Sequence, residues 1–527
     1  EIKNTERNKE KIGNMLELAP EHSLVKAWFD LHNEFVRATH YKSSSTSVEK
    51  IHSAFLQLCA LLYGRIAPYF DTHAELDRLL AIESPAAEEL ERVRVLLVRP
   101  QLRQHFFMRL QYSSWLVYLE SGGYFKNAPD RKVWPDGKWS FRKWPQGEYL
   151  ARVVKNEPER VTEILLTIPK ELQNPAVWAV VVDAAKVMPG AYSSRLIPLL
   201  KCALKNAPSE LFPHLAIDLV KVLAEQGEQS AFDLAKALLV LSSDPKVEEE
   251  GQQSDARSRW LSGRHETEWM LKRIEVYDLK KFCEKVLPAL EALDPIHTVE
   301  FLAGQLERSI KLGQPAVDPN GWFVHDHGRW CPYLDRDGHG DDVRAIFARA
   351  FTALAKRVSR QDSASAKAVL EVIRRSTNSL FIRISYAVLE SAGILLQQEL
   401  DKVVASGELI DPPFGVREAA ALLRAQFSSA SPDAKRLFCY AIERGPNAET
   451  VKDLVLVRRD YESRRAEHPS DADEPISEAE ISEAVGSWQR KRLGRFHDQL
   501  PPELQPLAER LDFKPQVPNP EDQALDE

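Results

Sequence analysis

The sequence is poor in the features that mark several common protein classes. Its five cysteines lie far apart in 527 residues, and none belongs to a paired C-x-x-C motif for zinc or redox chemistry. Several cysteines fall inside apolar helical patterns such as "FCEKVL", where a free thiol behaves as a small buried hydrophobe. This cysteine usage indicates a reducing, cytoplasmic environment.

Long apolar runs and an excess of positive charge are also missing. No run of about 18 apolar residues occurs, and the charged start "EIKNTERNKEKIGNM" lacks the basic and then apolar order of a signal peptide. The net charge of -8 and the pI near 6.0 give no overall attraction to nucleic acid or to anionic membranes. We therefore expect neither as a partner. The first residue is Glu1 rather than methionine, so we expect a piece of a longer protein.

Alternating strand patterns are absent, and helical periodicity takes their place. In "SELFPHLAIDLVKVLAEQ" the apolar residues recur every three or four positions, which predicts an amphipathic helix. Ser209 stands where an N-cap belongs, and Gly227 stands where the helix should end. The same pattern recurs along most of the chain. The sequence therefore predicts an all-α fold.

The predicted helices are organised as a repeat. Between residues 147 and 242 they follow one another through short joints at "KNEPER", "LQNPAV", "MPGAYS" and "KNAPSE", each of which contains proline. Two helices make a unit of roughly 35 to 40 residues, as in helical-hairpin repeats. We predict a HEAT-like α-solenoid of antiparallel helical hairpins with an N-terminal helical region. The predicted segments are an N-terminal helical region (1–120), a Trp/Pro-rich connector (121–146), the solenoid (147–467), acidic and basic C-terminal helices (468–511) and a disordered tail (512–527).

Four stretches carry a resemblance to a known family. They are "RPQLRQHFFMRLQYSSWLVYLESGGYF", "WPQGEYLARVVKNEPERVTEILLTI", the Asp-rich loop that runs into "DDVRAIFARAFTAL", and "WQRKRLGRFHDQLPPEL". In this order they resemble the helical-repeat region of large bacterial NTPases of the STAND class, often of NACHT type, which are associated with phage defence. The resemblance implies a solenoid that senses a ligand or supports oligomerisation. No G-x-x-x-x-G-K-[ST] motif occurs, so no phosphate-binding loop is assigned.

The segment "WFVHDHGRWCPYLDRDGHGDD", residues 322–342, has the composition of a metal site, with three histidines, one cysteine and five aspartates. An EF-hand that starts at Asp335 fails, because its twelfth position is Ile346 where a bidentate glutamate is required. A zinc site would use His325, His327, Cys331 and His339. The favoured alternative is a packed loop between helices in which Asp341 and Asp342 cap the next helix.

Two further stretches suggest nucleic-acid chemistry. Arg37 and His40 resemble the catalytic pair of HEPN ribonucleases, but that family places more residues between them than the two found here. An ordinary helical surface is the favoured interpretation. A basic stretch near the C-terminus could contact phosphate, but nearby glutamates favour a salt-bridged surface or a domain contact. The basic and aromatic residues are Arg490, Lys491, Arg492, Arg495, Trp488 and Phe496, and the acidic ones are Glu478, Glu480 and Glu483.

The connector's tryptophans, Trp134, Trp139 and Trp144, allow a carbohydrate-binding interpretation, but anchoring in the core is favoured because large rings hold irregular segments down. We assign no catalytic, cofactor or metal-binding residues. The sequence predicts a non-catalytic sensor or scaffold that binds a protein partner through its solenoid and can form homo-oligomers. The alternative is an enzyme, either a helical nuclease or a metal-dependent hydrolase.

Overall fold

The structure of the chain is a computed structural model. It describes residues 56, 60, 71–134, 139–206, 211–242, 271, 273–313, 331, 333–335, 342–412, 414–466, 475–496 and 499–514. The chain folds as two compact units, Glu1–Phe212 and Pro213–Glu527. The boundary between them falls inside a helix and coincides with none of the predicted segment boundaries, which stay predictions.

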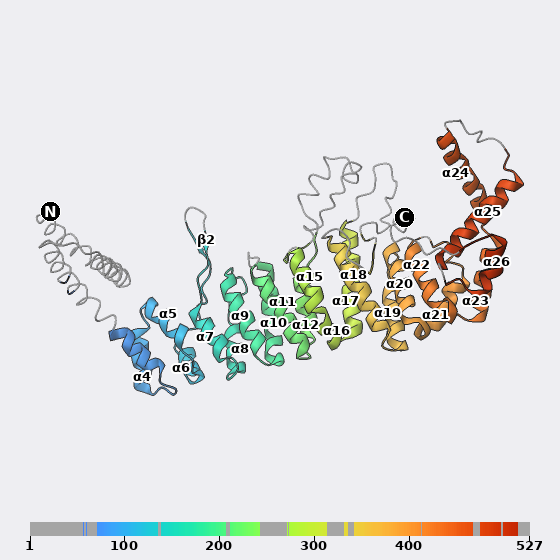
Figure 1. Cartoon of the computed structure of the whole chain (residues 1–527). Coiled ribbons are helices and arrows are strands. Elements are labelled where there is room, and N and C mark those ends of the chain that lie inside the picture. The colour runs from blue at the N-terminus through green and yellow to red at the C-terminus, as the bar shows by residue number, and fades with distance from the viewer. Residues whose placement is uncertain are drawn as a thin grey trace, which may run out of the picture. The chain divides into compact units, whose positions relative to one another are not determined.

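The first unit consists of short helices joined by tight turns (Figure 1). After the helical residues 71–80, one small hairpin interrupts the helices: β1 pairs with β2 in antiparallel fashion, with Lys132 opposite Ser140. The elements are α4 (Ala87–Leu96), α5 (Pro100–Arg109), η1 (Ser113–Trp115), α6 (Leu116–Ser121), β1 (Lys132–Val133), β2 (Trp139–Ser140), α7 (Pro145–Val153), α8 (Pro158–Leu166), α9 (Pro175–Val187), α10 (Gly190–Asn206) and the first two residues of α11 (Leu211–Glu225).

The second unit also consists of successive helices joined by turns. Its elements, after the rest of α11, are α12 (Ser230–Leu238), α15 (Val276–Lys285), α16 (Leu287–Leu293), α17 (Pro295–Gly313), α18 (Val343–Ser359), α19 (Ser363–Arg374), α20 (Ser379–Ala392), η3 (Gly393–Leu396), α21 (Gln397–Ala405), α22 (Val416–Gln426), η4 (Phe427–Ser429), α23 (Pro432–Arg444), α24 (Ala448–Ala466), α25 (Glu478–Leu493), η5 (Gly494–Phe496), η6 (Pro502–Leu504) and α26 (Gln505–Arg510). Among the described residues, helices joined by turns make up both units, and the strand structure is limited to β1, β2 and one bridge between Leu241 and Leu271. The all-α prediction is confirmed.

Helices contact their second neighbours as well as their first. In the first unit α7 packs on both α5 and α9, while α8 packs on α10. In the second unit α20 packs on both α18 and α22, while α17 packs on α19 and α21 packs on α23. Consecutive helices such as α17 and α18, or α19 and α20, also pack together.

Proline and glycine mark the helix boundaries as expected. Three of the predicted joints lie between helices, because α8 begins at Pro158, α9 begins at Pro175 and Pro189 directly precedes α10. Gly227 follows α11 with φ of +82°, and the Glu228 amide donates to the Leu223 carbonyl oxygen, which is the bond of a Schellman cap. The predicted N-cap, Ser209, lies outside the described residues.

The connector between α6 and α7 is held by one buried amide. Asn174, at the N-cap of α9, accepts a hydrogen bond from the Ala176 backbone and donates two from Nδ2, to the carbonyl oxygens of Pro129 and Arg142, each at 2.8 Å. A single side chain thus fastens both ends of the β1–β2 hairpin to α9. Trp144, which follows the hairpin, is buried with 1% of its surface exposed.

Helical residues Ser379–Ala405 form the one segment in the described part of the chain that is long and apolar enough to span a membrane. The fold buries 67% of the 18-residue apolar window within this segment, and buried core helices meet the same criterion of length and composition. The four cysteines that the structure describes, Cys202, Cys283, Cys331 and Cys439, are free thiols.

Candidate functional site

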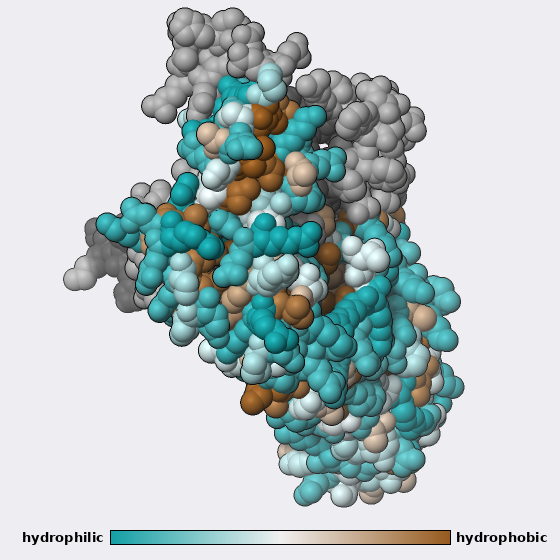
Figure 2. Space-filling model, turned by 90° about the vertical axis from the view of Figure 1, so that its right-hand side faces the viewer, coloured by the Kyte–Doolittle hydropathy of each residue, from teal (hydrophilic) through white to brown (hydrophobic). Residues whose placement is uncertain are grey.

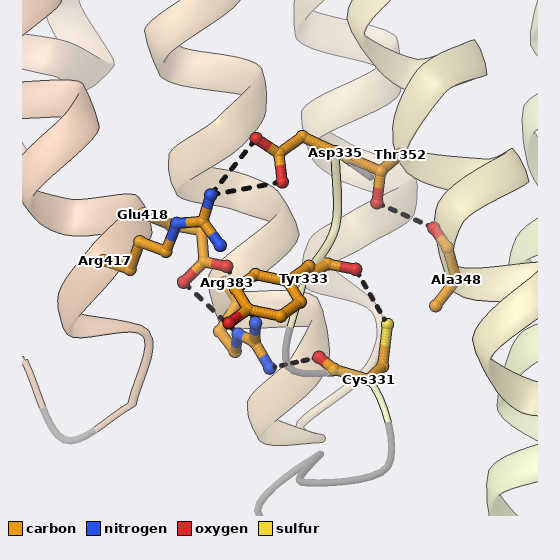
Figure 3. A network of polar contacts seen from close by, with 8 residues as sticks. All are labelled: Cys331, Tyr333, Asp335, Ala348, Thr352, Arg383, Arg417 and Glu418. Carbon is orange, nitrogen blue, oxygen red and sulfur yellow. Dashed lines mark hydrogen bonds and ion pairs between the residues drawn. The ribbon is translucent and has the colours of Figure 1, made fainter. Parts of the chain in front are cut away.

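The Asp- and His-rich loop is described only at its C-terminal end, at Cys331, at residues 333–335 and at Asp342. His325, His327 and His339, which the alternative zinc site would use with Cys331, lie outside the described residues, as does Asp341. What the structure does show is how the end of the loop attaches to α20 and α22 (Figure 3).

A buried ion pair forms the centre of this attachment. Arg383 of α20 and Glu418 of α22 have side chains only 5% and 9% exposed, and Arg383 Nη2 lies 2.8 Å from Glu418 Oε1. A second bond, from Arg383 Nε to Glu418 Oε2 at 3.3 Å, makes the pair bidentate. Arg383 Nη1 also donates to the Cys331 carbonyl oxygen at 2.9 Å. One guanidinium therefore joins two helices and the loop.

Gly415, the N-cap of α22, makes room for this pair. Its φ is +72°, in the left-handed region that glycine adopts at little cost. A Cβ atom at this position would lie 2.6 Å from Arg383 Cγ and 3.1 Å from Glu418 Oε2. The site therefore requires glycine both for the backbone angle and for the close approach of Arg383.

The Cys331 side chain is packed inside the fold at the end of the loop. It is fully buried, its Sγ–H donates to the Tyr333 carbonyl oxygen at 3.5 Å, and burial raises the pKa of the thiol to about 11. The thiol is therefore protonated at neutral pH. The burial and hydrogen bond of Cys331 fit the packed-loop interpretation, and the zinc alternative stays untested because its histidines lie outside the described residues.

A second arginine, Arg417 of α22, contacts the outer edge of the loop. The Arg417 guanidinium carbon lies 4.7 Å from the centroid of the Tyr333 ring, and Arg417 Nη2 lies 3.3 Å from Asp335 Oδ2. Asp335 is 64% exposed, so its attraction to Arg417 is screened by water. Ring stacking and a surface ion pair therefore hold this edge, outside the buried pair (Figure 3).

The predicted carboxylate cap is present at Asp342. Its Oδ1 accepts from the Arg344 backbone amide at 2.8 Å at the start of α18, and its Oδ2 pairs with the Arg344 side chain at 2.8 Å. Ile346, which would occupy the twelfth EF-hand position, lies in α18 and is 5% exposed. The cap prediction is confirmed for Asp342, and Ile346 of α18 packs in the core.

The basic stretch at the end of α25 makes internal contacts. Arg495 is buried and donates to the Leu409 carbonyl oxygen at 2.8 Å. Arg492 pairs with Asp411 and lies over the Trp488 ring, 4.3 Å from its centroid. The Trp488 indole N–H donates to the same carboxylate at 3.1 Å. These two arginines therefore bind the segment between α21 and α22. This agrees with the prediction that the stretch forms an internal contact surface.

The glutamates at the start of α25 pair with arginines of α24. Arg459 Nε lies 2.8 Å from Glu480 Oε1, and Arg458 Nη1 lies 2.7 Å from Glu483 Oε1. Hydrogen bonds from Arg459 and from Ser477 lower the pKa of Glu480 to about 2. Opposite charges along this region thus tie two helices together.

This pairing predicts that the α24–α25 contact loosens in acid. Because the pKa of Glu480 is depressed in the folded chain, its stabilisation is complete above the unfolded pKa, near 4.5, and is lost as the pH falls toward about 2. Hydrogen exchange of α24 amides, corrected for the intrinsic effect of pH, should therefore accelerate between about pH 5 and pH 2.5. Glu480→Gln should flatten this dependence, and an unchanged pH profile in that variant would contradict the assignment.

The tryptophans of the connector differ in their surroundings. Trp144 is buried, as core anchoring predicts, but Trp134 is 45% exposed, so the prediction is wrong for that residue. Trp134 follows β1, on the hairpin that projects beyond the helices in Figure 1, and Lys132 Nζ covers its ring at 3.4 Å from the centroid. The Trp139 side chain lies outside the described part of the structure.

Two imidazole–carboxylate pairs were missed by the sequence analysis. His214 Nδ1 lies 2.7 Å from Asp278 Oδ1, with Asp278 buried and His214 39% exposed. His105 Nε2 lies 2.7 Å from Asp77 Oδ1, which also pairs with Arg109. No sequence motif links such partners, because they come from different helices. Each pair joins two helices, and the His214 pair also orients an imidazole as a general base would be oriented.

Among the described residues, no group of three or more histidine, cysteine, aspartate and glutamate side chains could hold a metal ion. Arg37 and His40 lie outside those residues. Comparisons with protein-family models, with curated proteins and with solved structures find no match.

Proposed function

We propose that this chain is a HEAT-like α-solenoid that binds a protein partner without catalysing a reaction, as the sensor or scaffold part of a cytoplasmic bacterial STAND-type defence protein. The observation that carries the proposal is the packing of alternate helices, α5 on α7 on α9 and α18 on α20 on α22. Stacked helical hairpins place alternate helices in separate rows, and each row leaves an extended outer face for a partner.

The polar network of the loop supports a structural role. Arg383 and Glu418 neutralise each other, and the Cys331 thiol is protonated and hydrogen-bonded. A nucleophile or general base would need an accessible reactive atom next to a substrate position. In this proposal the network instead holds the loop on α20 and α22, next to the partner surface.

The alternative function is catalysis, which the oriented imidazole of His214 favours most directly. Purified chain is assayed with a panel of nucleoside triphosphates, RNA and DNA, beside His214→Ala and beside an Arg37→Ala, His40→Ala double variant. The proposal expects no turnover above background in any of them. Turnover that disappears in either variant would replace the scaffold with an enzyme.

Small-angle X-ray scattering tests the architecture independently. A compact globule of 527 residues has a radius of gyration of about 24 Å. A solenoid is expected to give a clearly larger radius and an elongated pair-distance distribution at low protein concentration. A value close to the compact one would overturn the solenoid, whatever the assays show.

A further inference from the structure

Helix α24 presents an apolar face that α25 does not cover. The helix has 19 residues, so it is about 28 Å long. Among the described elements it packs mainly on α25, through a small core of Val451, Val455 and Ala484. Val457 and Tyr461 remain 68% and 64% exposed. Figure 2 views this end of the molecule and shows a strip of hydrophobic side chains where α24 and α25 project.

One side of α24 has coiled-coil spacing. Val457 and Tyr461 on it are exposed, whereas Thr450 is half-buried and Leu454 is half-buried against the core of Val451, Val455 and Ala484. Thr450, Leu454, Val457 and Tyr461 follow one another at intervals of four, three and four residues, which is the a and d pattern of a heptad repeat. With about 3.6 residues per turn, this seam lies roughly a quarter turn around α24 from Val451, which faces α25. The spacing fits a helix that runs alongside α24, in addition to α25.

The charges beside the seam identify the second helix. If Leu454 is at an a position, Asp453 is at g and Arg458 is at e. In a parallel pair of identical helices, each g residue faces the e residue five positions later in the other chain, so Asp453 faces Arg458 twice. An antiparallel pair would instead place like charges together. Arg458 also binds Glu483 of its own chain, and its guanidinium has enough N–H groups for both carboxylates.

We propose that α24 is a self-association helix. Two copies of the chain pair their α24 seams as a short parallel coiled coil, with Asp453 of each copy opposite Arg458 of the other. This inference does not rest on the proposed partner binding, because it uses a different surface. A seam of about two heptads buries little area, so the dimer is weak and reversible.

Analytical ultracentrifugation of the full chain, from about 1 to 300 μM, should show a reversible equilibrium between monomer and dimer. Val457→Asp places a charge in the seam and should raise the dissociation constant at least about tenfold. Ile394→Ser changes a similarly exposed apolar residue, 76% exposed on η3, and should leave the constant unchanged. A monomer at all concentrations, or a dimer indifferent to Val457→Asp, would overturn the proposal.

Charge exchange tests the parallel register. Asp453→Arg places arginine opposite arginine, and Arg458→Asp places aspartate opposite aspartate, so each variant alone should lose dimerisation. A mixture of the two variants restores both opposite-charge pairs and should form a heterodimer. Circular dichroism checks that Arg458→Asp, which also loses its bond to Glu483, keeps its helices. Dimers of Asp453→Arg as tight as those of the unaltered chain would refute the register, even if Arg458→Asp fails to fold.

Discussion

Glu418→Ala is expected to lower the free energy of unfolding by about 3–5 kcal/mol. The substitution leaves the Arg383 guanidinium charged and buried without the Glu418 carboxylate, while Nη1 still donates to the Cys331 carbonyl oxygen. Urea-induced unfolding followed by circular dichroism measures the loss. Hydrogen exchange should locate it in α20 and α22. The effect is large because an uncompensated charge in the interior costs far more than an exposed one.

A matched double variant separates the cost of leaving one charge buried and unpaired from the contribution of the ion pair to stability. Arg383→Met with Glu418→Leu removes both charges and fills the space with apolar side chains, so the protein should lose less stability than with Glu418→Ala alone. Arg357→Ala is a surface control, because Arg357 is 49% exposed and its pair with Glu291 should contribute under about 1 kcal/mol. A double variant less stable than the single one would show that the pair stabilises the fold by more than mutual neutralisation.

Gly147→Ala is expected to destabilise the first unit by about 2–3 kcal/mol, although alanine is a better helix former than glycine. A Cβ atom on Gly147 would lie 2.1 Å from Cε3 of Trp144 and 2.6 Å from two more atoms of that ring. The indole is rigid and only 1% exposed, so it has no room to move aside. Thermal and urea unfolding both report the loss.

The same substitution elsewhere should have the opposite sign. Gly304 lies within α17, and a Cβ atom there would meet no heavy atom within 4 Å. Gly304→Ala should therefore stabilise the second unit by about 0.5–1 kcal/mol, through the lower entropy of the unfolded chain. If Trp144→Leu is combined with Gly147→Ala, the cost of the alanine should largely disappear. Equal costs of Gly147→Ala with and without Trp144 would exclude the clash as the cause.

Local signals predicted the helices and their ends, because periodicity, prolines and capping residues act within a few positions. Gly227 and Asp342 are examples, since each acts on residues within one turn. The partners of Arg383 could not be predicted in this way. Glu418 and Cys331 lie 35 and 52 residues away in sequence, and only the packing of α20 on α22 brings them to one guanidinium.

The candidate site was only partly predictable for the same reason. Its composition singled out the loop, and Cys331 was considered only as a ligand of the alternative zinc site, but the burial of its thiol depends on distant helices. Trp134 and Trp144 have the same chemistry and similar neighbours in sequence, yet one is exposed and the other buried. What separates them is whether a helix covers the ring, which is a property of the tertiary fold.

The two bonds from Asn174 Nδ2 anchor the chain on both sides of the β1–β2 hairpin, so the hairpin can be replaced without loss of these anchors. Since Pro129 and Arg142 are both held by one amide, the chain between them starts and finishes at fixed points whatever its length. Doubling the length of such a loop costs only about 0.6 kcal/mol in closure entropy. Related chains can therefore vary this hairpin in length and sequence while α7 and α9 stay in place. An epitope or a fluorescent reporter can be grafted there on the same principle.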